Sequence, residues 1–289
     1  MRTSYKCIPC FFRQIEAACS LIDLKKEKVK DLLTVLTKEL LQFDFSQPPV
    51  VFGRTIYKNI SRISGTRDIF GREKIRIERH LLKLGPYIKK VIKKAKDPLY
   101  TAAKMCCAAN AIDFGTGKVP DIKKVLPEIK RIKLQVDHFP IFKDKLKTIK
   151  KLLIIGDNCG EAFFDRFFIE EILKDSLSLK IFYAVRSSPI INDVLISDAK
   201  RFGIDILANL ISSGCDYPGL VLSKTSNYFR RIYSQADVII SKGQGNFESL
   251  QDKRKDIFYL FQIKCVSVSQ FLSLPVNSLL FIHSKTRSD

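Results

Sequence analysis

The sequence lacks two features that would direct the chain to a membrane or out of the cell. Residues 1–12 carry charges and a proline and have no apolar core, so they do not resemble a secretory signal. The longest stretch without a charged side chain, Cys265 to Ser284, is interrupted by five serines, a glutamine, a proline and an asparagine. It is not expected to span a bilayer. The resulting expectation is a cytoplasmic protein with no membrane partner.

Histidine is scarce and cysteine is not arranged for a soft metal. The chain has three histidines and eight cysteines, too few thiols for a small disulfide scaffold. Cys7 and Cys10 form a CxxC pair, but no second pair follows at zinc-ribbon spacing, and the nearest histidine is His80. A zinc site and a redox pair stay open as readings of this pair. Ordinary buried or helix-start thiols are the preferred reading.

Acidic side chains are in deficit only in the first half of the chain. The net charge is +20, and the 289 residues are 46% hydrophobic and 28% charged, which is typical of a folded globular protein. Residues 1–150 carry 33 Lys and Arg against 15 Asp and Glu, a net charge of +18, whereas residues 151–289 carry 17 against 15, a net charge of +2. The basic half is compatible with a nucleic-acid or polyanion partner, but solvated lysine-rich helix faces are the simpler interpretation.

The hydrophobic pattern changes along the chain from helical to alternating. Three- and four-residue spacing of apolar side chains predicts helices in the first part. The expected helices are Phe11 to Leu24, Lys28 to Leu41, Arg72 to Leu84, Tyr87 to Lys96, and one from Pro98 through Ala111 that ends near Gly115. Breaks are expected at Gln47-Pro48-Pro49 and at Gly85-Pro86. We therefore predict a helical N-terminal domain over residues 1–98 and a second domain over residues 99–289.

The second domain is expected to be an α/β fold. Short apolar runs, each interpreted as a buried strand, alternate with amphipathic helices, a pattern that favours a mostly parallel sheet covered on both faces. The expected strands are Leu152–Ile155, Ile181–Val185, Ile204–Leu207, Val238–Ile240 and Ile257–Phe261. The expected helices are Glu161 to Leu173, Asn192 to Arg201 and Ser223 to Tyr233. Ligands of such sheets collect beyond the carboxyl ends of the strands.

Oxygen-bearing side chains follow two of the expected strands. Asp157 and Asn158 follow the first strand, and Asp193 follows the second. Two carboxylates and an amide oxygen form a partial shell for Mg²⁺ or Mn²⁺. The alternative is that the Asp-Asn pair only caps a helix. From spacing alone, a helix cap is the commoner role of such a pair.

A lysine and two glycines follow the strand at Val238–Ile240. Lys242 precedes a loop in which Gly243 and Gly245 permit close backbone approach, and the N–H groups around Asn246 can face an anion. A dinucleotide-binding fingerprint is excluded, because Glu248 occupies its third glycine position. Arg186 is a candidate phosphate clamp, or else a partner for an acidic side chain. The loop itself is either a phosphate site or a tight strand-to-helix turn.

Five segments, in this order, carry a family resemblance. They are Cys7 to Gln14, Ala109 to Gly115, Gly156 to Glu161, Arg186 to Asp193 and Ala236 to Glu248. Together they resemble the successive motifs of the damage-control phosphatases, formerly called domain of unknown function eighty-nine, in the stand-alone microbial branch. The resemblance covers nearly the whole chain.

The resemblance implies a metal-dependent phosphatase with a helical N-terminal part and a three-layer α/β domain. By motif, Asp157, Asn158 and Asp193 match metal ligands for Mn²⁺, Ni²⁺, Co²⁺ or Mg²⁺, and the two aspartates are the candidate catalytic residues. Lys242, Gly243, Gly245 and Asn246 match a phosphate-contacting segment. Glu161, Arg186 and Asn192 lie inside matching motifs and are assigned to substrate binding.

The predicted function is hydrolysis of small phosphomonoesters, either sugar phosphates or damaged phosphorylated metabolites. The partner is then a small phosphorylated metabolite. One alternative is a nucleic-acid or polyanion-binding protein with an inactive phosphatase-like site. Another is a transferase or sensor that uses the same phosphate site without hydrolysis.

Overall fold

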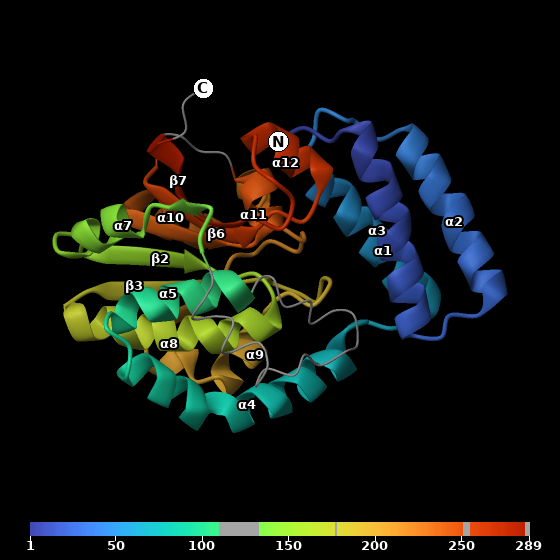
Figure 1. The fold of residues 1–289 in the computed structure, drawn as a ribbon. Helices are drawn as coiled ribbons and strands as arrows, with labels where there is room; N and C mark the ends of the chain where they lie inside the picture. The colour runs from blue at the N-terminus through green and yellow to red at the C-terminus, as the bar shows by residue number, and fades with distance from the viewer. Residues whose placement is uncertain (110–132, 177, 251–254, 287–289) are drawn as a thin grey trace.

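A mostly parallel sheet lies at the centre of the larger part of the molecule (Figure 1). The computed structural model describes residues 1–109, 133–176, 178–250 and 255–286. Within these residues the sheet has seven strands in the order β1-β7-β6-β5-β2-β3-β4, and only the β6–β7 pair is antiparallel. The strands are β1 (Val136–Asp137), β2 (Lys151–Ile155), β3 (Lys180–Val185), β4 (Asn209–Ser212), β5 (Val238–Lys242), β6 (Ile257–Gln262) and β7 (Leu279–His283).

Helices cover both faces of this sheet, which confirms the predicted α/β class. The helices of this part are α4 (Gly71–Lys93), α5 (Pro98–Ala109), α7 (Phe139–Leu146), α8 (Cys159–Asp175), α9 (Ile196–Arg201), α10 (Asn227–Gln235), α11 (Gln244–Ser249) and α12 (Val266–Leu272). Side chains of β2 alternate between the two faces. Leu152 and Ile154 join the core that contains α4, α5 and α8, and Leu153 joins the core that contains α10 and α11.

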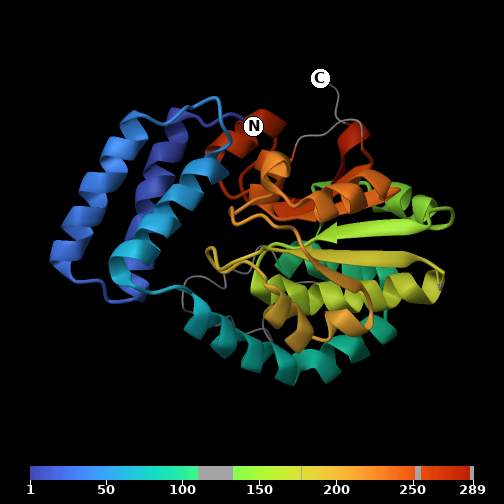
Figure 2. The ribbon, with the colours of Figure 1, turned by 180° about the vertical axis from the view of Figure 1, so that it is seen from behind.

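Three N-terminal helices form a separate bundle. α1 (Ile8–Leu21), α2 (Lys26–Leu41) and α3 (Pro49–Ser64) share their own apolar core, which includes Phe11, Leu32 and Ile56. Figures 1 and 2 show this bundle beside the sheet, beyond the carboxyl end of β2. The next helix, α4, packs instead on α8 through Ile77 and Leu81 in the core of the sheet. Through this packing, α4 shares a core with the sheet. The domain boundary predicted at residue 98 stays a prediction.

The predicted break at Gln47-Pro48 lies between α2 and α3, whereas the second predicted break differs from the structure. Gly85-Pro86 does not end a helix, because α4 continues through Pro86. A proline inside a helix removes one hydrogen bond. Burial of Ile88 and Ile92 on the following turn keeps the helix continuous. The prediction also left residues 50–64 unassigned, whereas Pro49 stands at the start of α3, where its missing N–H costs no hydrogen bond.

Two predicted elements around β4 are also wrong. Residues Ile204–Ile206 form a 3₁₀ turn rather than a strand, and the strand is β4, which begins at Asn209. The helix expected from Asn192 begins only at Ile196, because the preceding residues form a loop in which Asp193 makes an isolated β-bridge with Asn158. The strand β7 was not predicted.

The predicted motif over residues 110–115 lies outside the described residues. None of the helices described is long and apolar enough to cross a bilayer.

Candidate active site at the switch point of the sheet

The two motif segments meet because their strands are neighbours. From β2 the chain continues through β3 to β4 on one side, and then returns to β5 on the other side of β2. In parallel sheets, the crevice at such a reversal is the usual place for a ligand. Ile155 pairs with Ser241 in the β2–β5 register, so Asp157 and Gly243 leave the sheet side by side. The topology therefore brings Asp157 and Gly243 together at the switch point of the sheet.

The contact between these segments requires glycine at position 243. A β-carbon built on Gly243 would lie 2.0 Å from Asp157 Oδ2, far inside van der Waals distance. Gly243 also has a φ of 79°, a backbone conformation that residues other than glycine rarely adopt. The Asp157 carboxylate thus lies directly against the backbone of the glycine loop.

Arg186 connects three segments of the site. Its Nε donates a hydrogen bond to Asp193 Oδ2 at 2.6 Å, and its Nη2 donates to Asn246 Oδ1 at 2.8 Å. The same Nη2 lies 3.8 Å from Asp157 Oδ1. The side chain is 1% exposed. Because a planar guanidinium fixes the direction of each donor, Arg186 sets the relative positions of the loops after β2, β3 and β5.

The two aspartates lie in an environment that favours a bound cation. Burial raises the pKa of Asp157 well above its usual value, and the negative charges of Glu161 and Asp193 raise it further. Burial likewise raises the pKa of Asp193, although the charge of Arg186 opposes this. A cation placed among these oxygens would favour their ionised forms. Among the described residues, no three His, Cys, Asp or Glu side chains converge as a metal site. The predicted ligand set is of a different kind, because it consists of two carboxylates and an amide oxygen.

Asn158 performs the structural role that was the alternative to metal binding. It is the N-cap of α8, and its Oδ1 accepts a hydrogen bond from the Glu161 N–H at 2.9 Å. Its Nδ2 donates to the Glu161 carboxylate, and its backbone bridges to Asp193. An amide oxygen has two lone pairs, so the cap leaves one for a metal. The donor set therefore fits a hard divalent cation, and the ligand role of Asn158 stays a prediction.

Lys242, the last residue of β5, lies in a buried ionic network. Its Nζ is 2.8 Å from Glu161 Oε2 and 2.7 Å from Asp165 Oδ1, and the side chain is 1% exposed. Tyr183 donates a hydrogen bond to the other Asp165 oxygen at 2.8 Å. Burial alone would lower the pKa of Lys242, but the two carboxylates raise it well above its usual value. In this arrangement the ammonium neutralises internal carboxylates, and its contact with phosphate stays a prediction.

Sequence reasoning did not identify two residues of this environment. Asp165 follows Glu161 by one turn of α8, so the two carboxylates lie on the same side of the helix and Lys242 contacts both. Lys74 of α4 is buried, and its Nζ lies 3.3 Å from both the Asp193 carbonyl oxygen and Asp198 Oδ2. The available signal was a lysine on the apolar face of a helix, three residues before Ile77.

The rest of the glycine loop is held by backbone contacts. Asn246 is fully buried, and its Nδ2 donates to the carbonyl oxygens of Lys242 and Gly156. A β-carbon on Gly245 would lie 2.2 Å from the Pro218 carbonyl oxygen. The N–H of Gly243 donates to Leu260. These contacts make the loop a tight strand-to-helix turn, and the phosphate role of its N–H groups stays a prediction.

The loop before Asp193 is strained. Ile191 has a φ of 44°, a left-handed conformation that is unfavourable for a β-branched residue. The Asp193 N–H donates to the Ile190 carbonyl oxygen, and the Asn192 carbonyl oxygen accepts from the Cys159 N–H. Strain of this kind gathers at functional sites. The predicted substrate contact of Asn192 stays a prediction.

The CxxC pair lies at the start of α1. Cys7 is the N-cap, Pro9 occupies the first turn, and Gln14 Nε2 lies 3.4 Å from Cys10 Sγ. Neither thiol forms a disulfide, and both are partly buried. The arrangement agrees with helix-start thiols, the preferred reading.

Comparison with known proteins identifies the family. The model of the damage-control phosphatase ARMT1-like domain matches residues 3–280. The chain is similar to a damage-control phosphatase of Pyrococcus horikoshii, with 31% identity over 99% of both chains. It is also similar to a damage-control phosphatase of Archaeoglobus fulgidus, with 25% identity over 97% of this chain and 98% of that protein.

A solved structure has the same fold. The crystal structure of a DUF89 family protein from Pyrococcus horikoshii superposes with a TM-score of 0.91 at 30% identity. The match covers 99% of this chain and all of that chain. The chain therefore belongs to the damage-control phosphatases with an ARMT1-like domain.

Proposed function

We propose that this protein hydrolyses small phosphomonoesters with the help of a divalent metal ion, on either sugar phosphates or damaged phosphorylated metabolites. Family membership supports phosphatase activity and a role in metabolite damage control. The observation that carries the proposal is the convergence of Asp157 and Asp193 on Arg186 at the switch point of the sheet. A cytoplasmic location remains an expectation.

Asp157, Asp193 and the Asn158 amide oxygen would hold the metal ion, one of Mn²⁺, Ni²⁺, Co²⁺ or Mg²⁺. When bound, such an ion supplies positive charge that stabilises a phosphoryl group during transfer. Arg186 orients Asp193 through its 2.6 Å hydrogen bond. Gly243 leaves room for Asp157, because any side chain there would displace the carboxylate.

Hydrolysis breaks the bond between phosphorus and the ester oxygen, and water supplies the oxygen that replaces it. The attacking group is either a water molecule or one of the two aspartates, which would form a phospho-aspartyl intermediate that water then cleaves. Overall, water gives one proton to the leaving ester oxygen, so the products are an alcohol and inorganic phosphate. Glu161, Lys242 and Asn192 would help to orient the substrate at this edge of the sheet.

A substrate screen tests this function. The chelated protein is given Mn²⁺, Ni²⁺, Co²⁺ or Mg²⁺ in turn, with a panel of sugar phosphates, nucleotides and phosphopantetheine-like compounds, and released phosphate is measured. We expect release that depends on the metal. Release that is equally fast in the chelated protein would exclude the metal role. Thermal stabilisation by a compound without phosphate release would instead indicate a sensor or a transferase.

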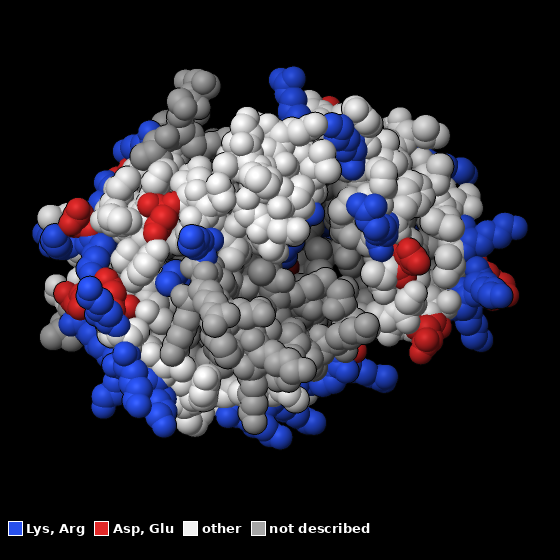
Figure 3. All heavy atoms as spheres, in the orientation of Figure 1, with Lys and Arg blue, Asp and Glu red and all other residues white. Residues whose placement is uncertain are grey.

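A second function is favoured by the surface of α4. Its exposed cations are Arg72, Arg76, Arg79, Lys83, Lys89, Lys90 and Lys93, and neither of its two acidic side chains, both of which are described, is exposed. Blue side chains gather along the lower edge of the molecule in Figure 3, where α4 lies in Figure 1. A continuous basic helix face fits a polyanion such as a nucleic acid.

Titration with DNA and RNA at several salt concentrations tests this second function. If α4 binds a polyanion, affinity falls steeply as salt increases, and the triple variant Lys83→Glu, Lys90→Glu, Lys93→Glu binds more weakly than the wild-type protein. Absence of salt-sensitive binding near physiological ionic strength would remove this function and leave the lysines as a solvated helix face.

A further inference from the structure

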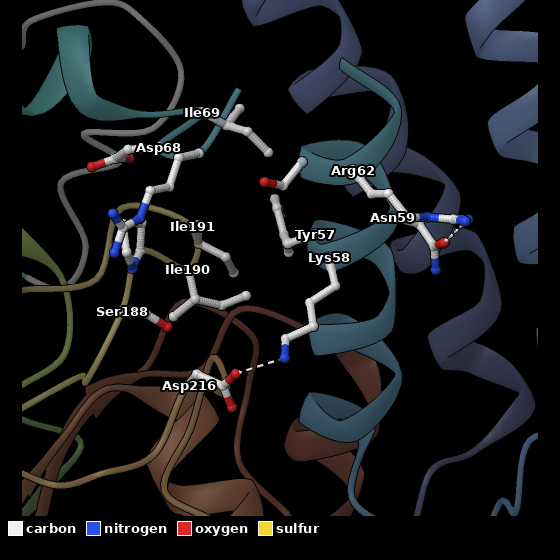
Figure 4. A pocket seen from close by; sticks show the side chains of 13 residues that line it. Tyr57, Lys58, Asn59, Arg62, Asp68, Ile69, Ser188, Ile190, Ile191 and Asp216 are labelled. Carbon is white, nitrogen blue, oxygen red and sulfur yellow. Dashed lines mark hydrogen bonds and ion pairs between the residues drawn. The ribbon is translucent and has the colours of Figure 1, made fainter. Parts of the chain in front are cut away.

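A pocket of about 460 Å³ lies beside the candidate active site. One wall comes from α3 and the segment that follows it, and the facing wall is the loop Ser188–Ile191 (Figure 4). Its volume is in the range of small-molecule sites. It therefore has room for the part of a substrate that does not react.

The pocket and the carboxylates share one loop. Ile190 and Ile191 line the pocket, and Asp193 follows two residues later. Two residues of extended chain span at most about 7 Å between α-carbons. The strained Ile191 fixes this connection. A molecule with its phosphoryl group at Asp193 would thus reach the pocket with its next few atoms.

The two carboxylates that line the pocket are already neutralised. Asp216 accepts from Arg54 at 2.7 and 2.8 Å and pairs with Lys58 at 2.9 Å. Asp68 lies 3.3 Å from the buried ammonium of Lys74. Arg54 and Lys74 do not belong to the pocket lining, so they offset the negative charge from outside.

Two arginines of the lining have no acidic partner among the residues that the structure describes. Arg62 donates only to the neutral Asn59 side chain, at 2.8 Å. Arg67 is exposed and makes no hydrogen bond or ion pair with the described part of the chain. The centre of the pocket is apolar, with Tyr57, Ile190 and Ile191 around it. In Figure 4 the Arg62 side chain points away from Ile190 and Ile191, so the site combines an apolar floor with the exposed guanidinium of Arg67.

We propose that this pocket binds a second anionic group of the substrate, a carboxylate or a second phosphate, and that Arg67 is the main residue that recognises it. A guanidinium without a partner can form two parallel hydrogen bonds to such a group. The preferred substrates are then phosphomonoesters whose short carbon skeleton carries another negative charge. This inference rests on the proposed phosphatase function.

The test compares three phosphate esters of similar size. Glycerol 3-phosphate has no second anion, 3-phosphoglycerate has a carboxylate, and propane-1,3-diol bisphosphate has a second phosphate. We expect kcat/KM to be higher for one or both of the doubly anionic compounds. In Arg67→Gln the preference should fall about tenfold or more, as expected for loss of a charge-assisted contact, and Arg67→Lys should restore part of it. Arg231→Gln, an exposed arginine on α10, is the matched control and should keep the preference.

Equal kcat/KM for all three compounds in the wild-type protein would overturn the inference, as would a variant that loses activity on all three alike. Calorimetric binding of the same compounds to the full chain separates this failure from failure of the proposed function. Arg67-dependent, tighter binding of a doubly anionic compound without phosphate release would keep the pocket assignment and exclude the phosphatase. Equal binding of all three, or none, would exclude the pocket assignment.

Discussion

Asp157 and Gly243 lie in such close contact that a β-carbon on Gly243 would be 2.0 Å from Asp157 Oδ2. The two residues are 86 positions apart and follow neighbouring strands of the sheet. Their contact is the most direct link between the predicted metal half and the predicted phosphate half of the site. Each half is a local sequence motif, and the β2–β5 pairing brings the two halves together.

Gly243→Ala should remove most activity. A side chain at a φ of 79° costs about 1–3 kcal/mol in backbone strain, and the new methyl group would also displace the Asp157 carboxylate. Phosphate release and thermal unfolding measure the two effects. Gly85→Ala is the control, since Gly85 lies inside α4 with open space around it, and alanine there should stabilise the protein by about 0.5–1 kcal/mol. An active Gly243→Ala variant would show that the close contact has no role.

Lys242→Met should destabilise the fold by about 3–5 kcal/mol, because it leaves Glu161 and Asp165 as buried carboxylates without their cation. The free energy of unfolding from urea titration measures this loss. Tyr183→Phe, which removes only a hydrogen bond to Asp165, should cost about 1 kcal/mol. If Lys242→Met instead keeps full stability and only raises KM, the ammonium acts on substrate and not on these carboxylates.

Stability should decrease between about pH 4.5 and pH 7 because of Glu248. Burial raises its pKa from 4.5 to about 7, although a hydrogen bond from Gln244 opposes the shift. The folded protein therefore binds a proton that the unfolded chain has released, and this stabilisation is present below pH 4.5 and lost as pH rises through 7. The full effect is about 3 kcal/mol. Glu248→Gln should remove this part of the pH dependence. If the unfolding free energy of the variant changes between pH 5 and pH 8 as much as that of the wild-type protein, the assignment to Glu248 is contradicted.

Local patterns predicted the sheet and the edge at which the motifs lie, because buried parallel strands appear as apolar runs. The strand and helix boundaries that failed depend on tertiary packing. Burial of Ile88 and Ile92 against the sheet core keeps α4 continuous through Pro86, an outcome that local propensity does not contain. The strand β7 occupies an antiparallel position that alternation of strands and helices does not suggest.

The site shows the same limit. The motifs identified Asp157, Asp193 and Arg186, and the structure brings them together. They did not reveal that Lys242 has two buried carboxylate partners, because Asp165 lies 77 positions away in the chain. They also did not identify Lys74, whose role depends on how α4 packs against the Asp193 loop. Contacts between distant segments decided the roles that sequence left open.

In the proposed function, Asp157 and Asp193 hold the metal ion required for phosphate release. This claim is tested most directly by metal-dependent phosphate release from the wild-type protein, Asp157→Asn and Asp193→Asn, with Asp205→Asn as an exposed control. We predict that both site variants stay folded and lose activity by at least about 100-fold, while the control keeps the wild-type rate. Metal-dependent release near the wild-type rate in either site variant would contradict the account.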